Sequence, residues 1–406
     1  MLRRIALLAL IIAIAPGCTT VKGWFGGGKV KPAEPAELQK LSNAMPVNKL
    51  WSISLGDGEG RSWLRSHPVL EGSRLYAIDD EGEVIAIDAT SGKKLWTSSA
   101  VDMKGKRSKL KFWSHEQLEA GLTGGPGVAN GLVVVGGRNG EVVAMDADTG
   151  TKRWTAKVSS EVLSAPLIVS GRVIVRSNDG RVFGLDAADG SRKWLFDRGL
   201  PLLTVRGNAS PVAGNGIVYI GYDDGTLVAL RDEDGLRVWE QAVAEPDGRT
   251  EIDRMADIDG EVQVGLEEVF ATSYHDQTMA MSAANGHPIW TAPVGSYAGI
   301  ALLGDKVLVS DKGGNVWALD RATGNSLWKQ DALARRQLTT PVVQGDYAVV
   351  GDLDGYLHWL RLDTGVIVAR TRIERAALRG TPQVSPDGVL YAVSNEGKLT
   401  AYKLGN

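Results

Sequence analysis

The side chains that could carry out catalysis or hold a metal are few in this chain, and they are scattered. The 406 residues include one cysteine, Cys18, and five histidines, none of them at a metal-ligand spacing such as HxH or HExxH. No GxSxG nucleophile elbow and no phosphate-binding GxxxxGKS/T loop is present. The sequence therefore predicts no catalytic residue and no metal site, and His67 and His358 are expected to be packed or surface residues.

Two pairs of aspartates could bind calcium, but their context favours a structural role. Asp223 with Asp224, and Asp352 with Asp354, precede a glycine in a repeated hairpin. Aspartate side chains accept hydrogen bonds from the backbone of a turn, and the following glycine takes a positive φ. We interpret both pairs as turn residues, with a calcium site as the alternative.

An internal repeat supplies the elements that must position all these residues. An apolar run, an acidic turn closing on glycine and a tryptophan four residues later recur, as in AIDATSGKKLW and ALDRATGNSLW. A further copy, WLRLDTGVIVA, has Ala369 in the tryptophan position, and the glycines from Gly92 to Gly365 are spaced by 45.5 residues on average. Such a period is typical of propeller blades or helical repeats. Alternating runs joined by Asp-Gly or Asn-Gly turns favour β-hairpins, and therefore blades.

The ends of the repeat give the number of blades. A proline opens a unit 28 residues before its final position at Pro68, Pro126, Pro166, Pro211 and Pro341. A unit opening at Pro382 would extend beyond Asn406, so its outer strand must come from elsewhere, and the strand around Trp51 has the right character. Such pairing removes both free sheet edges. The sequence predicts an all-β, eight-bladed β-propeller of four-stranded antiparallel blades, closed by pairing the N-terminal strand with the C-terminal blade.

The repeated tryptophans are predicted to pack between neighbouring blades, where a large flat side chain buries much apolar area. Ligand stacking is the alternative role for these residues. They are Trp51, Trp96, Trp154, Trp194, Trp239, Trp290 and Trp328.

The N-terminus has the features of an export signal. Arg3 and Arg4 precede an eleven-residue apolar run, which is too short to span a membrane, and small residues follow. Cys18 after a small residue resembles the lipobox of bacterial lipoproteins, which implies a lipid on Cys18 and, with Thr19 next, transfer to the outer membrane; an incidental thiol is the alternative. We expect a signal peptide at 1–17, the lipidated cysteine and a flexible Gly- and Pro-rich tether at 18–45, and one propeller domain at 46–406.

The net charge argues against a nucleic-acid partner. The full chain carries a formal charge of −3, and removing residues 1–17 takes away two arginines and makes it more acidic. Nucleic-acid binders normally have a basic domain.

Function in a propeller is expected where the connections depart from the period. The long connections are 97–125, 195–210 and 240–261. The second and third should be neighbours on one face, and they combine LPLLTVRGNAS with the acidic EPDGRTEIDRMADIDGE. An apolar anchor beside charges is typical of a protein-binding patch, whereas the alternative is loops that fold back or are solvated. The first contains basic residues from Lys104 to Lys111, suited to lipid headgroups or to a solvated loop.

The pattern A-x-D-x-x-T-G-x-x-x-W resembles the repeat of pyrroloquinoline-quinone dehydrogenases and of the non-enzymatic BamB family of outer-membrane protein assembly factors. LLTVRG and EIDRMADID are similar to the segment pair by which that family contacts the POTRA domains of the barrel insertase BamA. This resemblance assigns Leu203, Val205 and Arg206 to one contact segment and Asp257 and Asp259 to the other. Val205 stands where the family usually has leucine.

The BamB resemblance implies a scaffold lipoprotein of the outer-membrane β-barrel assembly (Bam) complex that is not an enzyme and has no cofactor. It further implies an outer-membrane location facing the periplasm, with unfolded outer-membrane β-barrel proteins as a second candidate partner. The quinone enzymes commonly carry adjacent cysteines and long extra loops, which this chain lacks. A periplasmic quinoprotein or ligand-binding propeller is the alternative function.

Overall fold

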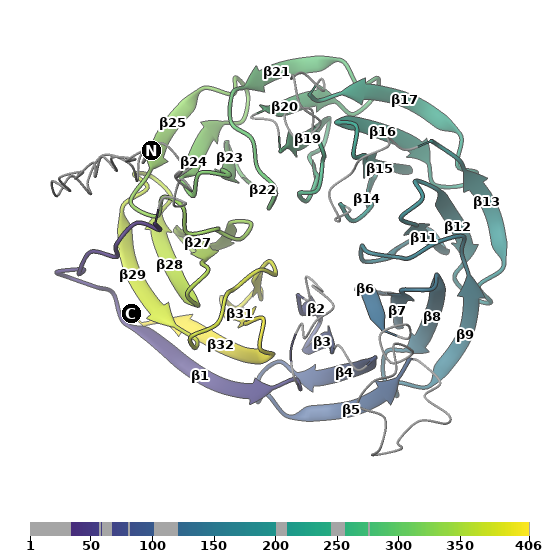
Figure 1. Cartoon of the computed structure of the whole chain (residues 1–406), viewed down its shortest axis with the longest axis horizontal. Helices are drawn as coiled ribbons and strands as arrows, with labels where there is room; N and C mark the ends of the chain where they lie inside the picture. Colours follow the sequence, from purple (N-terminus) through teal and green to yellow (C-terminus); the bar gives the residue numbers. More distant parts are fainter. Residues whose placement is uncertain are drawn as a thin grey trace, which may run out of the picture. The chain divides into compact units, whose positions relative to one another are not determined.

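The computed structural model describes residues 34–56, 58, 67–79, 82–100, 121–199, 209–244, 256–274 and 277–405. Residues Pro35–Asn406 form one compact unit, a ring of eight four-stranded sheets (Figure 1). Within the described ranges the regular elements are all β-strands. These ranges contain no helix with the length and apolar character needed to cross a membrane.

Each blade is an antiparallel meander from an inner to an outer strand. Blades 1 and 2 contain β2 (Val69–Glu71), β3 (Arg74–Ile78), β4 (Glu83–Asp88), β5 (Lys94–Ser99), β6 (Leu122–Ala129), β7 (Leu132–Gly137), β8 (Glu141–Asp146) and β9 (Lys152–Lys157). Blades 3 and 4 contain β10 (Leu167–Val169), β11 (Arg172–Arg176), β12 (Val182–Asp186), β13 (Arg192–Phe196), β14 (Val212–Gly214), β15 (Ile217–Gly221), β16 (Thr226–Arg231) and β17 (Arg237–Ala242).

The remaining blades follow the same plan. Blades 5 and 6 contain β18 (Gln263–Val264), β19 (Glu268–Ser273), β20 (Gln277–Ser282), β21 (Pro288–Ala292), β22 (Ile300–Leu303), β23 (Lys306–Ser310), β24 (Val316–Asp320) and β25 (Ser326–Gln330). Blades 7 and 8 contain β26 (Val342–Gln344), β27 (Tyr347–Gly351), β28 (Tyr356–Arg361), β29 (Ile367–Arg372), β30 (Gln383–Val384), β31 (Leu390–Val393), β32 (Lys398–Leu404) and β1 (Val47–Ser54).

The two ends of the propeller close the ring in blade 8. Its strand order is β1-β32-β31-β30, and β1 runs antiparallel to β32 from the pair Val47 and Leu404 to the pair Ser54 and Lys398. Figure 1 shows the purple β1 beside the yellow β32. The predicted eight-bladed architecture and its closure by the N-terminal strand are confirmed.

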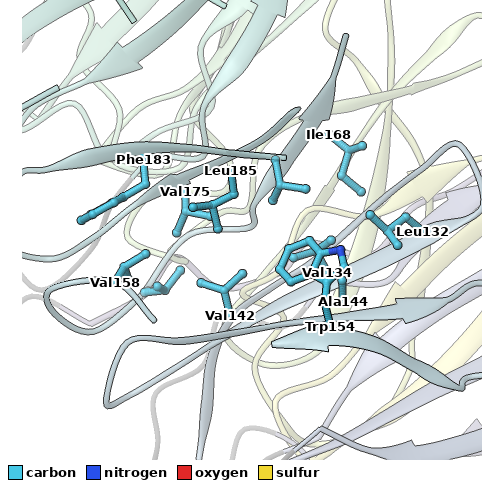
Figure 2. Close-up of a cluster of buried hydrophobic side chains, with 12 residues drawn as sticks. Leu132, Val134, Val142, Ala144, Trp154, Val158, Ile168, Val175, Phe183 and Leu185 are labelled. Carbon is cyan, nitrogen blue, oxygen red and sulfur yellow. The ribbon is translucent and has the colours of Figure 1, made fainter. Parts of the chain in front are cut away.

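The hydrophobic core lies between the blades. Middle strands such as β11 and β12 are buried on both faces, because each sheet is covered by the blades on either side. Figure 2 shows this for blades 2 and 3, where Val142 and Ala144 of β8 face Val175 and Leu185 of the next blade, with Trp154 among them. This explains why these strands are apolar at consecutive positions rather than at alternate ones.

The repeated tryptophans join one blade to the next. Each indole N–H donates to a backbone carbonyl in the last hairpin of the following blade, at 2.8–3.1 Å. Each ring also lies against the glycine of that hairpin, whose φ is between +71° and +75° and where an added Cβ would lie 2.5–2.6 Å from the ring. These contacts place seven tryptophans between neighbouring blades: Trp51, Trp96, Trp154, Trp194, Trp239, Trp290 and Trp328.

At the interface between blades 7 and 8 the tryptophan and the small residue opposite it have changed strands. Elsewhere the outer-strand tryptophan pairs with a small residue on the third strand, as Trp239 does with Ala229. In blade 7 the third strand carries Trp359, which pairs with Ala369. Trp359 is fully buried, so Ala369 does not mark a degenerate interface: its tryptophan has moved to the neighbouring strand.

One side chain connects this displaced tryptophan to blade 8. Gln344 accepts the indole N–H of Trp359 at 2.6 Å and donates to the carbonyl of Gly388 at 2.8 Å.

Replacing Gln344 with alanine leaves a buried indole donor without this partner, so we expect the free energy of unfolding in urea to fall by about 1–3 kcal/mol. Gln241→Ala, on an outer strand, is the control and should stay within about 0.5 kcal/mol of the parent. Equal losses in the two variants would refute this role for Gln344.

The compact unit begins earlier than the boundary predicted at residue 46. Residues Pro35–Met45, here called the N-terminal strap, lie against blades 6 and 7. The Ala36 amide donates to the Ala334 carbonyl, the Met45 amide donates to the Val368 carbonyl, and Leu38 packs into the cluster between the two blades. The strap has no sequence period but is held by these contacts. Cys18 and the basic residues from Lys104 to Lys111 lie outside the described residues.

Candidate functional site

The candidate docking site lies on the face formed by the blade-to-blade connections and the hairpins between second and third strands, here called the connection face. Leu203, Val205 and Arg206 lie outside the described residues. Asp257 and Asp259 are described, on the segment Ala256–Glu261 that leads into blade 5. The structure therefore shows where the described ends of the connections after blades 3 and 4 lie.

Both ends meet at the hairpin between β15 and β16. From the connection after blade 3, Arg198 forms ion pairs with Asp224 at 2.6 Å and Glu240 at 3.0 Å. From the connection after blade 4, the Ile258 amide donates to the carbonyl of Tyr222 at 3.2 Å. The two connections are thus neighbours on the connection face, as their lengths and positions in the chain led us to expect.

The segment Ala256–Glu261 is fixed between blades 4 and 5. Ile258 is fully buried, and a Cβ added to Gly221 would lie 2.5 Å from its side chain. The carbonyl of Asp257 accepts the Tyr274 amide at 2.9 Å. A side chain enclosed in this way holds the whole segment in one conformation.

The two aspartates of this segment are buried. Asp257 is 1% exposed and Asp259 is 9% exposed. The alternative, that the two acids belong to a solvated loop, is therefore wrong for Asp257 and Asp259. Both are buried together with Ile258, which lies between them. Charged groups that leave water need compensating interactions, so these carboxylates are a strong local constraint on structure as well as candidate contact residues.

A buried ionic cluster at the boundary of blades 3 and 4 supports this hairpin. Arg176, 1% exposed, pairs with Asp223 at 2.6 Å. The guanidinium groups of Arg176 and Arg198 lie 4.8 and 5.0 Å from the ring centroid of Tyr222. Burial raises the pKa of Tyr222 to about 12, against the effect of both arginines, and its hydroxyl donates to the Gly180 carbonyl at 3.1 Å.

The sequence did not reveal this cluster. Asp223 and Asp224 were interpreted as turn residues, and Asp224 does accept the Thr226 amide. Asp223 also pairs with Arg176 of blade 3, 47 residues earlier, and Asp224 pairs with Arg198 of the connection after blade 3, 26 residues earlier. Asp352 and Asp354 likewise combine a turn bond with ion pairs to Arg336. An arginine at the end of a second strand, as at Arg176, is the signal that could have indicated such a pair.

The inner strands of blades 1 to 5 surround a cavity of about 240 Å³. Its lining is mostly apolar and includes three of the opening prolines, with His67, Ser210, Glu261 and Gln263 as polar members. Across the ring, Glu261 accepts a hydrogen bond from Thr381 at 3.0 Å, and Thr381 in turn contacts Thr340 at 3.1 Å. In the part of the chain that is described, no group of three or more His, Cys, Asp or Glu residues is arranged to hold a metal ion.

The family model described as outer membrane protein assembly factor BamB matches residues 47–106 and 100–330 of this chain. The chain belongs to this family. A BamB from Xanthomonas campestris pv. campestris is 47% identical over 407 residues, covering 100% of this chain and 98% of that protein. BamB from Escherichia coli K12 is 36% identical over 399 residues, covering 98% of both chains.

Solved structures agree with this assignment. The crystal structure of BamB from Moraxella catarrhalis has a TM-score of 0.77 and 31% identity, covering 88% of this chain and 100% of that one. A quinohemoprotein alcohol dehydrogenase from Comamonas testosteroni has a TM-score of 0.66 but only 14% identity, covering 88% and 76% of the two chains. At that identity the dehydrogenase shares the fold, and the BamB family is the one supported by sequence.

Proposed function

We propose that this chain is a non-catalytic scaffold lipoprotein of the Bam complex that assists the assembly of β-barrel proteins in the outer membrane. Its membership of the BamB family is the observation that carries this proposal. The proposed anchor is a lipid on Cys18 after removal of residues 1–17, which leaves the propeller facing the periplasm. Unfolded β-barrel proteins are a second proposed partner, because outer strands offer edges to which an extended segment can add.

The proposed partner site comprises Leu203, Val205, Arg206, Asp257 and Asp259, and its proposed partner is the POTRA region of BamA. Support comes from the meeting of both connections at Tyr222 and from the rigid seat of Ile258. The segment Ala256–Glu261 is already held in one conformation and therefore loses little conformational entropy on binding. The ion pairs of Arg176 with Asp223 and of Arg198 with Asp224 lie on the hairpin whose Tyr222 carbonyl accepts the Ile258 amide.

The burial of both aspartates determines how the site should be tested. Charge reversal would put a lysine into a buried position and disturb the fold, whereas Asp257→Asn with Asp259→Asn removes the charge and keeps the shape. We expect this double variant to stay folded by circular dichroism and to bind purified POTRA domains of the cognate BamA about tenfold more weakly, by calorimetry or biolayer interferometry.

Two further variants complete this test. Asp305→Asn is the control. Asp305 lies in the hairpin between β22 and β23, where its side chain is 77% exposed, and the variant should bind like the parent protein. Leu203→Asp removes the proposed apolar anchor and should weaken binding without involving a buried charge. Unchanged affinity in both site variants would reject the docking site, and loss of affinity in the Asp305 control would mean that the effect is general electrostatics.

A further inference from the structure

Two arginines of blade 7 fasten the N-terminal strap to the ring. Arg336 donates from Nη1 to the carbonyl of Ala36, and Arg370 donates from Nη1 to the carbonyl of Gln39, both at 2.9 Å. Both bonds lie in the N-terminal half of the strap, at Ala36 and Gln39. The strap continues past β29 to reach β1 (Figure 1).

A buried histidine and aspartate hold the two arginines in place. Asp352 accepts from Nε of Arg336 at 2.7 Å and lies 2.9 Å from Nε2 of His358. Nε of Arg370 donates to Nδ1 of His358 at 3.1 Å. Both His358 and Asp352 are fully buried. Since Nδ1 accepts a bond, the imidazole is neutral and its proton is on Nε2, donated to Asp352.

Protonation of His358 is incompatible with this arrangement. A proton on Nδ1 would point at the N–H of Arg370 and place two cations about 3 Å apart in a buried site. Arg370 would have to turn away, and its bond to Gln39 would be lost with it. The neutral imidazole is therefore a condition for this part of the strap to remain attached.

We propose that His358, Arg370 and Arg336 form an acid-sensitive latch that holds the N-terminal strap on blade 7 and releases it when His358 takes up a proton. Release of the complete strap would add its eleven residues to the segment between Cys18 and the ring, extending its reach by up to roughly 40 Å. The consequence for the reach of the membrane anchor rests on the proposed lipid at Cys18. The latch itself does not.

The direction of the pH dependence follows from the surroundings of His358. Burial is the largest effect on its pKa and lowers it; Asp352 opposes this, while Arg370 and Arg336 add to it. Free histidine takes up a proton as the pH falls through about 6.5, whereas the latched histidine resists it. The latched state is therefore fully stable above that pH and loses stability as the pH falls below it.

Tyr356, Arg372 and Asp354 of the same blade lie around the latch. The ring of Tyr356 lies 6.1 Å from that of His358, and Arg372 lies 4.8 Å from the ring of Tyr356. Asp354 pairs with Arg336 at 2.6 Å. The strap adds Glu37 and Lys40, both exposed to solvent.

Hydrogen exchange of the full mature chain tests the latch. The strap amides of Ala36 and Met45 are the reporters, and amides of β27 are the internal reference. After correction for intrinsic exchange rates, protection of the strap should fall about tenfold between pH 7.5 and pH 4.5, while β27 is unchanged. Arg370→Met should show the low value at both pH values.

Two variants separate the latch from a general effect of acid. His358→Gln can accept from Arg370 and donate to Asp352 but does not titrate, so its strap should stay protected at both pH values. Arg361→Met removes an exposed arginine of the same blade, paired with Asp363, and should behave like the parent. A strap equally protected at both pH values in the parent, or a His358→Gln strap that is released in acid, would overturn the proposal. Binding to BamA is measured separately, so neither result depends on the other.

Discussion

Replacement of Trp239 with alanine is expected to lower the free energy of unfolding by about 3–5 kcal/mol, as for other large aromatic side chains removed from a core. Trp239 is 8% exposed, and its ring centroid lies 5.7 Å from that of Tyr219. Its N–H donates to the carbonyl of Ala283 in blade 5 at 2.9 Å. The variant therefore loses both the packing and the polar bond that join blades 4 and 5.

The neighbouring residue provides a control on the same strand. Val238 precedes Trp239 in β17 and is 49% exposed. Val238→Ala should change the free energy of unfolding by at most about 0.5 kcal/mol. Urea denaturation followed by circular dichroism measures both variants, and similar losses would show that β17 as a whole, rather than the inter-blade tryptophan, determines stability.

Gly286→Ala is expected to lower the free energy of unfolding by about 2–5 kcal/mol although it adds a single methyl group. The residue has φ +75°, which costs an alanine about 1–2 kcal/mol. Its Cβ would also lie 2.6 Å from the ring of Trp239, and forced repacking costs about 1–3 kcal/mol more. The loss is thus the sum of backbone strain and a clash across the blade interface.

Gly171 separates these two causes. It has φ +72°, and an added Cβ there would meet nothing within 4 Å. Gly171→Ala should therefore show the strain alone, about 1–2 kcal/mol by urea denaturation. A loss as large as that of Gly286→Ala would mean that the contact with Trp239 contributes nothing.

The ring could be predicted from the sequence because each blade repeats the same pattern of turn and packing residues. The glycine and tryptophan of each repeat fix the last hairpin of blades 1 to 6, and the missing outer strand at Pro382 identified β1 as the closing strand. The exchange of Trp359 and Ala369 was hidden because the pattern places tryptophan on the fourth strand. Only the pairing of β28 with β29 shows that the same space is filled from the other side.

The site was less predictable because its contacts are between residues far apart in the chain. The positions of Asp257 and Asp259 were identified by family resemblance, but their burial depends on Ile258 entering the ring beside Gly221. The N-terminal strap lacks any period, so its composition indicated a tether. Its attachment depends on Arg336 and Arg370, some 300 residues away along the chain.

The closure of blade 8 has a consequence for the order of folding. Ser52 of β1 is bonded to the carbonyl of Leu399, 347 residues later. At a synthesis rate of roughly 5–20 residues per second, β1 exists for about 20–70 s before its partner has been made. Throughout that time it is an unpaired strand with a free edge, open to pairing with the wrong partner. β1 is thus synthesised before the other strands of the ring but pairs last, and the complete ring cannot form until β32 has been synthesised.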